Sequence, residues 1–240
     1  MKVIPIASTQ LHTYAIESET PYIMDRGDLM GGFVTHIDEL HELAGRGCYT
    51  SWERKRPETA SNEGYLQNII GQLHFSVMEH GSVTFYASGV SRSLLAELTR
   101  HRHLSFSVIS QRYVDANDLS IVIPPIVYEL PLSDREWTIA DLKGFFDETS
   151  LKIYNELVEL FVEHGYKRKE AREAARAVLP NMTDSPMVVT GNIRAWRDVL
   201  SKRYHIAADK EIQIFAAEIL GHLRVLCPNS VQDIGDMYGD

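Results

Sequence analysis

Short apolar stretches separated by longer helical patterns give the chain a mixed α/β outline. The stretch SVTFYAS is rich in β-branched and aromatic residues, which favour a strand, and SIVIPP predicts a strand stopped by two prolines. The predicted strands cover residues 2–7, 82–88, 120–125 and 187–192.

Helices dominate the remainder of the pattern. Tyr65, Ile69 and Leu73 recur at four-residue steps, which indicates one apolar helix face. The predicted helices cover 37 to about 45, 62–74, 91–102, 134–163 with a break near Gly144, 167 up to Pro180, 194–203 and 209–226. We find no domain boundary, so residues 1–240 are expected to form a single domain.

Composition and charge restrict the function classes. The chain has 240 residues and a formal net charge of −9, which makes it a poor candidate for general nucleic-acid binding. Any anion site must therefore be a local cluster. Cys48 and Cys227 form neither a disulfide framework nor a zinc pattern, and no apolar run reaches membrane-spanning length. We expect a cytoplasmic protein without a membrane segment.

The strip RHRHLSFSVISQRY, residues 100–113, concentrates positive charge and hydroxyl groups. If the helix continued through them, Arg100 and Arg102 would point to different sides, because residues i and i+2 do not face each other. They would then serve two partners rather than form one clamp. The alternative is a solvated helix end followed by a loop.

A second cationic cluster follows in KRKEAREAARAVLPN. Arg168, Arg172 and Arg176 are spaced by four and share one helix face, which is usually a solvated face. Arg176, however, borders an apolar run and should have a partner, either a carboxylate or an anionic ligand.

A third cluster lies in TGNIRAWRDVLSKRYH. Asp198 stands four residues from both Arg194 and Lys202, so internal ion pairs explain part of the charge. Arg203 lies past the apolar Val199 and Leu200 and is not explained in that way.

Two further chemistries are set aside. His74, Glu79 and His80 lack the H-E-x-x-H spacing and an evident third ligand, so no metal site is expected. Ser110 has no base placed beside it, and an unactivated serine is a weak nucleophile.

These blocks together resemble the flavin-dependent thymidylate synthases. Arg-His-Arg, seven residues and then Ser, at 100–110, is similar to the signature of that family. The blocks HFSVMEH, SQRY, REAARAVLPN and TGNIRAWR follow the family's order, and the resemblance spans about residues 40–225.

The resemblance implies reductive methylation of dUMP to dTMP. Methylenetetrahydrofolate would be the carbon donor, and FAD, reduced by NADPH, the hydride carrier. It also implies an α/β (α+β) domain with a central, mostly antiparallel sheet flanked by long helices. The family assembles as a homotetramer with FAD at subunit junctions, so each site would draw on more than one chain.

The resemblance also implies roles for individual residues. Arg203 matches the arginine that favours ionisation at the uracil N3, and a fixed guanidinium suits charge developing at O2 and N3. The implied FAD contacts are Ser76, Arg100, His101, Arg102, Asn192, Ile193 and Arg194. The implied dUMP contacts are Glu97, Leu98, Thr99, Arg100, Ser110, Gln111, Arg112, Arg176 and Arg203.

The sequence departs from the family pattern at three positions. Val108 stands where Glu or Gln is usual, so Val108 and its neighbour Ile109 are expected to offer ligands only backbone contacts. Asp198 stands near the expected flavin site where Asn or His is common, and Ser107 replaces the commoner Asn. An anion at 198 would either disfavour a reduced, anionic flavin or pair with Arg194 or Lys202.

Two rival functions use the same arginines. One is a nonenzymatic protein that binds nucleotides or nucleic acid, which would hold no flavin tightly. The other is a degenerate family member retained for another use, as the departures at Val108 and Asp198 suggest. Because neither cysteine lies in the matched blocks, the cysteine-dependent thymidylate synthase mechanism is disfavoured.

Overall fold

A four-stranded antiparallel sheet forms the centre of the structure, a computed structural model that describes residues 1–24, 34–54, 56–235 and 237–238. The strand order is β1-β2-β4-β3. This arrangement confirms the predicted sheet type. The strands are β1 (Lys2–Ser8), β2 (Ser82–Ser88), β3 (Ser105–Val108) and β4 (Met187–Asn192).

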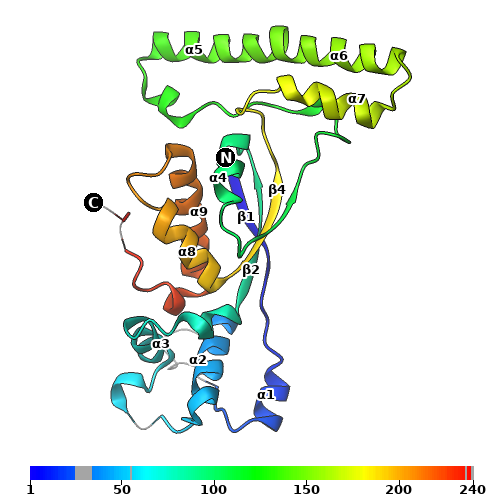
Figure 1. Ribbon diagram of the computed structural model, residues 1–240. Helices are drawn as coiled ribbons and strands as arrows, with labels where there is room; N and C mark the ends of the chain where they lie inside the picture. The colour runs from blue at the N-terminus through cyan, green and yellow to red at the C-terminus, as the bar shows by residue number, and fades with distance from the viewer. Residues whose placement is uncertain (25–33, 55, 236, 239–240) are drawn as a thin grey trace.

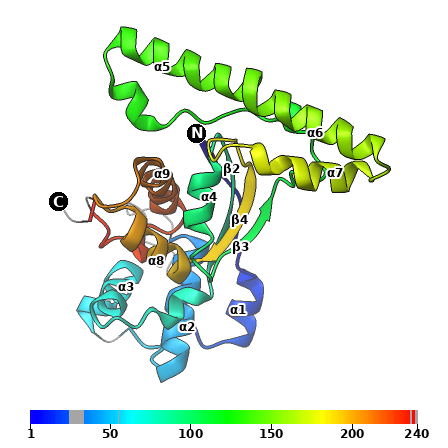
Figure 2. The same cartoon turned by 45° about the horizontal axis from the view of Figure 1, so that its top comes forward.

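Helices surround the sheet on one face and at both ends (Figures 1 and 2). Helices α8 and α9 lie against the sheet, α2 and α3 pack together at one end, and α5 with α6 forms a long rod at the other, beside α7. This confirms the mixed α/β class. The helices are α1 (Thr13–Glu19), α2 (His36–Tyr49), α3 (Asn62–Gly71), α4 (Arg92–Leu98), α5 (Leu132–Gly144), α6 (Leu151–Glu163), α7 (Arg168–Ala175), α8 (Ile193–Arg203) and α9 (Lys210–Leu226).

The core forms where the sheet meets α8 and α9. Along β2, Val83 and Phe85 are buried while their neighbours are half-buried, as the two-residue strand period requires. Trp196 of α8 lies edge-on to Phe85 with 5.1 Å between the ring centroids. Its indole Nε1 donates to the Val83 carbonyl at 3.2 Å, so the large ring is buried without an unsatisfied donor.

Two strands lead almost directly into capped helices. The Ser91 hydroxyl, shortly after β2, accepts from the Leu94 amide at 3.1 Å and begins α4. The Asn192 side chain, at the end of β4, accepts from the Ala195 amide at 2.8 Å and begins α8. The central strand pair therefore fixes where both helices begin.

Two predicted helix ends were wrong. The helix predicted over 91–102 ends at Leu98, because its buried face is complete there and the chain turns toward Leu104. The helix predicted to end near Gly45 continues to Tyr49. Gly45 is a close-packing position, since the Tyr65 side chain occupies the space that a Cβ would need.

Four further predicted elements differ from the structure. The helix predicted over 62–74 ends at Gly71, and Leu73 has a positive φ of 57° and is 72% exposed, so it does not extend the apolar face. The predicted strand 120–125 is reduced to one bridge, Ile121 to Thr183, because prolines cannot donate to a ladder. The predicted break near Gly144 is absent, and a π-helical turn, Phe145–Ser150, joins α5 to α6. The helix predicted up to Pro180 ends as a 3₁₀ turn, Arg176–Val178.

Helix α1 and strand β3 were not predicted. In β3, Ser105 and Ser107 are exposed and Phe106 and Val108 are half-buried. Two apolar residues in a strand of four are too few to identify it from the sequence. Among the described helices, none is long and apolar enough to cross a membrane.

Replacing Trp196 tests the packing of α8 on the sheet. We expect Trp196→Ala to lower the free energy of unfolding by about 3–5 kcal/mol, since it leaves a large cavity under α8. Tyr14→Ala, at a residue that is 82% exposed, should change it by less than about 0.5 kcal/mol. Urea denaturation at one protein concentration measures both. Similar values for the two variants would contradict this account of the core.

Candidate functional site

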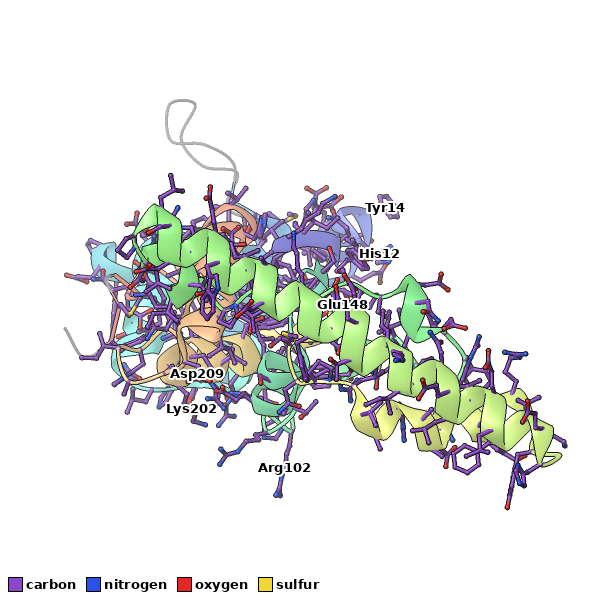
Figure 3. The ribbon with its side chains drawn as sticks, turned by 90° about the horizontal axis from the view of Figure 1, so that it is seen from above. His12, Tyr14, Arg102, Glu148, Lys202 and Asp209 are labelled. Atoms are coloured by element: carbon purple, nitrogen blue, oxygen red, sulfur yellow. The ribbon has the colours of Figure 1, made fainter. Side chains whose placement is uncertain are left out.

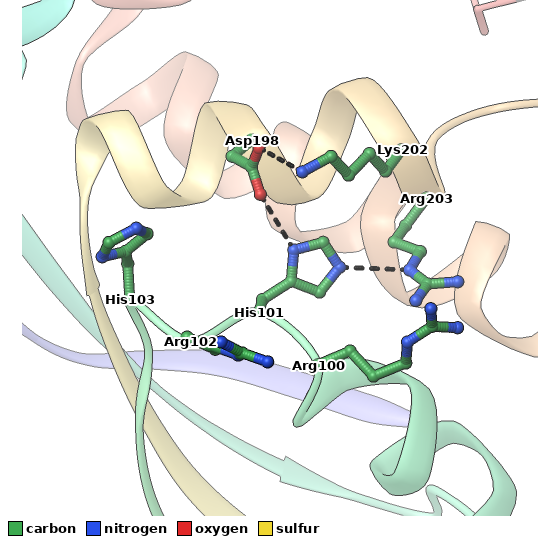
Figure 4. Close-up of a pocket in the computed structure, with 7 residues that line it drawn as sticks. All are labelled: Arg100, His101, Arg102, His103, Asp198, Lys202 and Arg203. Atoms are coloured by element: carbon green, nitrogen blue, oxygen red, sulfur yellow. Dashed lines mark hydrogen bonds and ion pairs between the residues drawn. The ribbon is translucent and has the colours of Figure 1, made fainter.

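A pocket of about 520 Å³ opens between the signature strip and α8 (Figure 4). Three arginines and one lysine line it, although the net charge of the chain is −9. Figure 3 shows Arg102 and Lys202 at the same edge of the molecule. The lining residues are Arg100, His101, Arg102, His103, Asp198, Lys202 and Arg203.

The strip reaches the pocket through a turn, not a helix. Beyond α4 the amide of Arg100 donates to the Glu97 carbonyl at 3.3 Å and that of His101 to the Leu98 carbonyl at 3.0 Å. The His101 ring turns inward and is buried, whereas Arg100 and Arg102 are exposed. The expectation of two arginines on opposite sides of a continuing helix was therefore wrong, and the turn places both at one pocket.

Arg203, at the end of α8, is held by three hydrogen bonds. Its Nη1 donates to the Glu97 carboxylate at 2.5 Å and its Nη2 to the Glu97 carbonyl at 3.1 Å. Its Nε donates to His101 Nε2 at 3.1 Å. The guanidinium is thus fixed in orientation at the pocket wall, as an arginine that stabilises a developing anion must be.

The ion pairs along α8 differ from those predicted. Asp198 pairs with Lys202 at 2.5 Å and accepts from His101 at 3.1 Å, so part of the expectation is confirmed. Arg194 instead pairs with Glu79 at 2.5 Å. Glu79 belongs to a 3₁₀ turn, Phe75–Glu79, which packs against α8 but is distant in sequence.

Burial and charge perturb three groups of the pocket. Burial lowers the pKa of the His101 imidazole, and Asp198 opposes that change. Burial and the neighbouring carboxyl of Asp209 raise the pKa of Glu97 despite the opposing charge of Arg203. Although partial burial would raise it, the hydrogen bonds from Lys202 and His101 lower the pKa of Asp198.

A second pocket, of about 330 Å³, borders the first and shares His103 and Asp198 with it. Asn192 and Arg194 line it, and exposed Ser76 lies on the same short turn as its wall residue Glu79. The structure thus gathers most residues of the implied flavin set. Ile193 differs, because its side chain is fully buried in the core.

The residues of the implied dUMP set divide into two groups. Glu97 and Arg203 lie at the first pocket, with exposed Thr99 and buried Leu98 beside them. The second group lines neither pocket and lies toward α7. There Arg112 pairs with Glu173 at 3.2 Å. This second group comprises Ser110, Gln111, Arg112 and Arg176.

The second group contains polar groups without protein partners. Gln111 is buried, and its Nε2 has no hydrogen-bond partner in the described part of the chain. Arg176 is exposed and, within the same ranges, its side chain forms no hydrogen bond or ion pair. The pKa of Arg92 is lowered mainly by burial and also by the positive charge of Arg176, so Arg92 lies near Arg176. Arg92 was missed from the sequence because it lies outside the matched motifs, at the first turn of α4.

Val108, the last residue of β3, and its neighbour Ile109 offer no polar side chain to a ligand. Val108 is half-buried and packs against the main core, and Ile109 is also half-buried. The Ile109 amide donates to the Pro186 carbonyl at 3.0 Å.

An α/β fold with two adjoining pockets, one strongly cationic, is suited to anionic ligands. Sequence comparison identifies the class more closely. A family described as thymidylate synthase complementing protein matches residues 33–229. The chain therefore belongs to this family of flavin-dependent thymidylate synthases.

Individual relatives agree with that assignment. A probable flavin-dependent thymidylate synthase of Mycobacterium phage D29 is 51% identical over 237 residues, covering 98% of this chain and 96% of its own. That of Mycobacterium phage L5 is 54% identical over 200 residues, covering 83% and 82%. The flavin-dependent thymidylate synthase of Mycobacterium avium (strain 104) is 45% identical over 192 residues, covering 79% and 76%.

Two matched glutamate variants test which ion pair stabilises the site. Glu97→Gln should lower the free energy of unfolding by about 1–3 kcal/mol, because it weakens a charge-assisted, partly buried bond beside several cations. Glu79→Gln should change it by less than about 0.5 kcal/mol, since the Glu79–Arg194 pair is about half exposed. Thermal and urea unfolding measure both. Equal effects would show that the Arg203 contact is no better ordered than the surface pair.

Proposed function

We propose that this chain converts dUMP to dTMP by reductive methylation. The observation that carries the proposal is the cationic pocket formed by the signature strip and α8. Arg100 and Arg102 have no side-chain partner in the described ranges, and unpaired guanidinium groups suit phosphate oxygens. The relatives' printed names supply the reaction class.

The pocket residues fit a flavin dinucleotide chemically. Its pyrophosphate is an anion, and Arg100, Arg102 and Arg194 would hold it, with Asn192 and Ser76 beside them. When bound, FAD reduced by NADPH supplies the hydride, and methylenetetrahydrofolate supplies the carbon. The two free cysteines suit a reducing compartment, so we place the reaction in the cytoplasm.

Arg203 is assigned to the pyrimidine. Its guanidinium would stabilise negative charge at uracil O2 and N3, which makes C5 electron-rich. Glu97 and His101 hold the guanidinium in place before substrate arrives, so its reorganisation does not add to the barrier.

We propose a homotetramer, the assembly that the family resemblance implies, and the exposed surface of α5 supports contact between copies. Helix α5 buries none of its side chains, and Leu132 and Trp137 on it are 64% and 68% exposed. Apolar groups so placed favour contact with another copy. A second copy would also bring Arg92, Gln111 and Arg176 to a site that they do not line here. A monomer at micromolar concentration in sedimentation would contradict this assembly.

One catalytic domain over residues 1–240 is part of the same proposal. The main buried cluster includes residues from Val3 through Ile234, which supports a single cooperative unit.

Arg203→Ala tests the catalytic assignment. The variant should retain bound flavin, seen as absorbance near about 450 nm, but lose turnover by about 10²–10³-fold, because one preorganised charge donor is removed. Formation of dTMP with NADPH and methylenetetrahydrofolate is the measurement. Near-normal turnover would refute the role of Arg203. A wild-type protein that binds no flavin and oxidises no NADPH with dUMP would refute the proposed function.

Arg176→Ala tests the second part of the dUMP site. We expect the KM for dUMP to rise by about tenfold or more, because a charge-assisted bond to phosphate is lost, with a smaller effect on kcat. Arg168→Ala, at the exposed first residue of α7, which ends just before Arg176, is the control and should leave KM unchanged. If the two substitutions raised the KM for dUMP equally, Arg176 would act only through the overall positive charge of the region and not through a contact with dUMP.

A further inference from the structure

Asp198 links a lysine and a histidine of the first pocket. Its Oδ1 accepts from Lys202 Nζ at 2.5 Å, and its Oδ2 lies 3.1 Å from Nδ1 of His101 (Figure 4). The His101 side chain is only 5% exposed, whereas that of Asp198 is 43% exposed. The carboxylate thus reaches from solvent to a buried ring.

The contact with Arg203 determines which nitrogen of His101 carries the proton. A guanidinium can only donate, so His101 Nε2, 3.1 Å from Arg203 Nε, must accept with its lone pair. The ring proton of the neutral imidazole is then on Nδ1, facing Asp198. An ionised carboxylate can only accept, so both neighbours favour the same tautomer.

His101 completes the fixation of the Arg203 guanidinium. Glu97 binds the two terminal nitrogens through its carboxylate and its carbonyl. The third nitrogen, Nε, donates to His101, its one partner among the described residues. If Glu97 were its only partner, the guanidinium could still tilt about the two bonds to Glu97. The bond to His101 fixes the plane of the group.

We propose that Asp198 is a positioning residue for Arg203, acting through His101. It holds the imidazole with the proton on Nδ1, so that Nε2 is free to accept from Arg203. In this chain the carboxylate favours that tautomer because it can only accept, whereas an amide could also donate to Nδ1 and admit the opposite tautomer. The inference rests on the proposed role of Arg203 at the pyrimidine.

The arrangement predicts a particular dependence on pH. His101 faces Asp198, Lys202 and Arg203 from α8. Glu97, Arg100, Arg102 and His103 also lie around the pocket, and Asp209 lies beside Glu97. Burial and the nearby cations lower its pKa below the ordinary 6.5, and Asp198 opposes this. Protonated His101 would turn an N–H toward the N–H of Arg203. Turnover should therefore fall as pH decreases through the pKa of His101.

The tautomer of His101 is the first test and needs no ligand. In ¹⁵N-labelled wild-type protein, ring nitrogen shifts should show Nδ1 protonated and Nε2 unprotonated near neutral pH. The opposite tautomer in the wild type would overturn the proposal, whatever any variant does. In Asp198→Asn, we expect the Nε2-protonated form to increase.

Kinetics of Asp198→Asn are the second test. We expect kcat to fall by about 10- to 100-fold with little change in the KM for dUMP, on the scale seen for partners that orient an active group. The acid limb of the kcat profile should move to lower pH, because the group that raises the pKa of His101 is gone. Asp198→Glu, which restores a carboxylate, should recover part of the loss.

Asp233→Asn is the matched control. It breaks another ion pair of α8, between Arg197 and Asp233 at 2.6 Å, but leaves the pocket intact, so tautomer, kcat and acid limb should not change. If Arg203→Ala is inactive while Asp198→Asn keeps normal kcat and acid limb, the positioning role is wrong and the role of Arg203 stands. If Arg203→Ala is active, both proposals fail.

Discussion

The antiparallel pairing of β2 with β4 is the constraint on which the site depends. The two strands lie at the centre of the sheet, with Ser82 opposite Asn192 and Ala87 opposite Met187. Each continues into a helix that its own cap begins, α4 after β2 and α8 after β4. The end of α4 and the outer face of α8 form the two walls of the cationic pocket. A shift of register between the strands would separate His101 from Asp198 and Arg203.

Holding several cations together in one pocket requires compensating anions. Glu97 and Asp198 provide them from opposite walls, each bound to one cation of α8 and linked through His101. The side chains of Arg100 and Arg102 have no hydrogen-bond or ion-pair partner among the described residues. An acidic protein can thus concentrate positive charge locally without forcing the like charges onto each other. The same two carboxylates order Arg203 in advance of any substrate.

The sequence predicted most elements but not the contacts that make the site. Periodicity identified the strands that carry the core and the helices α3, α8 and α9, since burial imposes a regular pattern there. It failed at helix ends that tertiary contacts determine. The helix α2 continues past Gly45, which packs closely against Tyr65, and α4 ends once its apolar face is buried. The resemblance to family motifs identified Arg203 and the strip 100–113 as candidate site residues. It could not show that Glu79 binds Arg194 or that Arg92 lies near Arg176, because neither pairing is local in sequence.

Two of the three departures from the family pattern, Val108 and Asp198, have different physical meanings. Val108 is half-buried against the core, so an apolar side chain there removes a possible ligand contact and satisfies packing at the same time. Asp198 lies at the border of both pockets and binds a lysine and a histidine. Its charge is already balanced by Lys202, so a bound flavin would meet a neutral pair rather than a free anion. Because Asp198 pairs with Lys202, its charge should oppose a reduced, anionic flavin less than a free carboxylate would. The effect of Asp198 is instead directed through His101 toward Arg203.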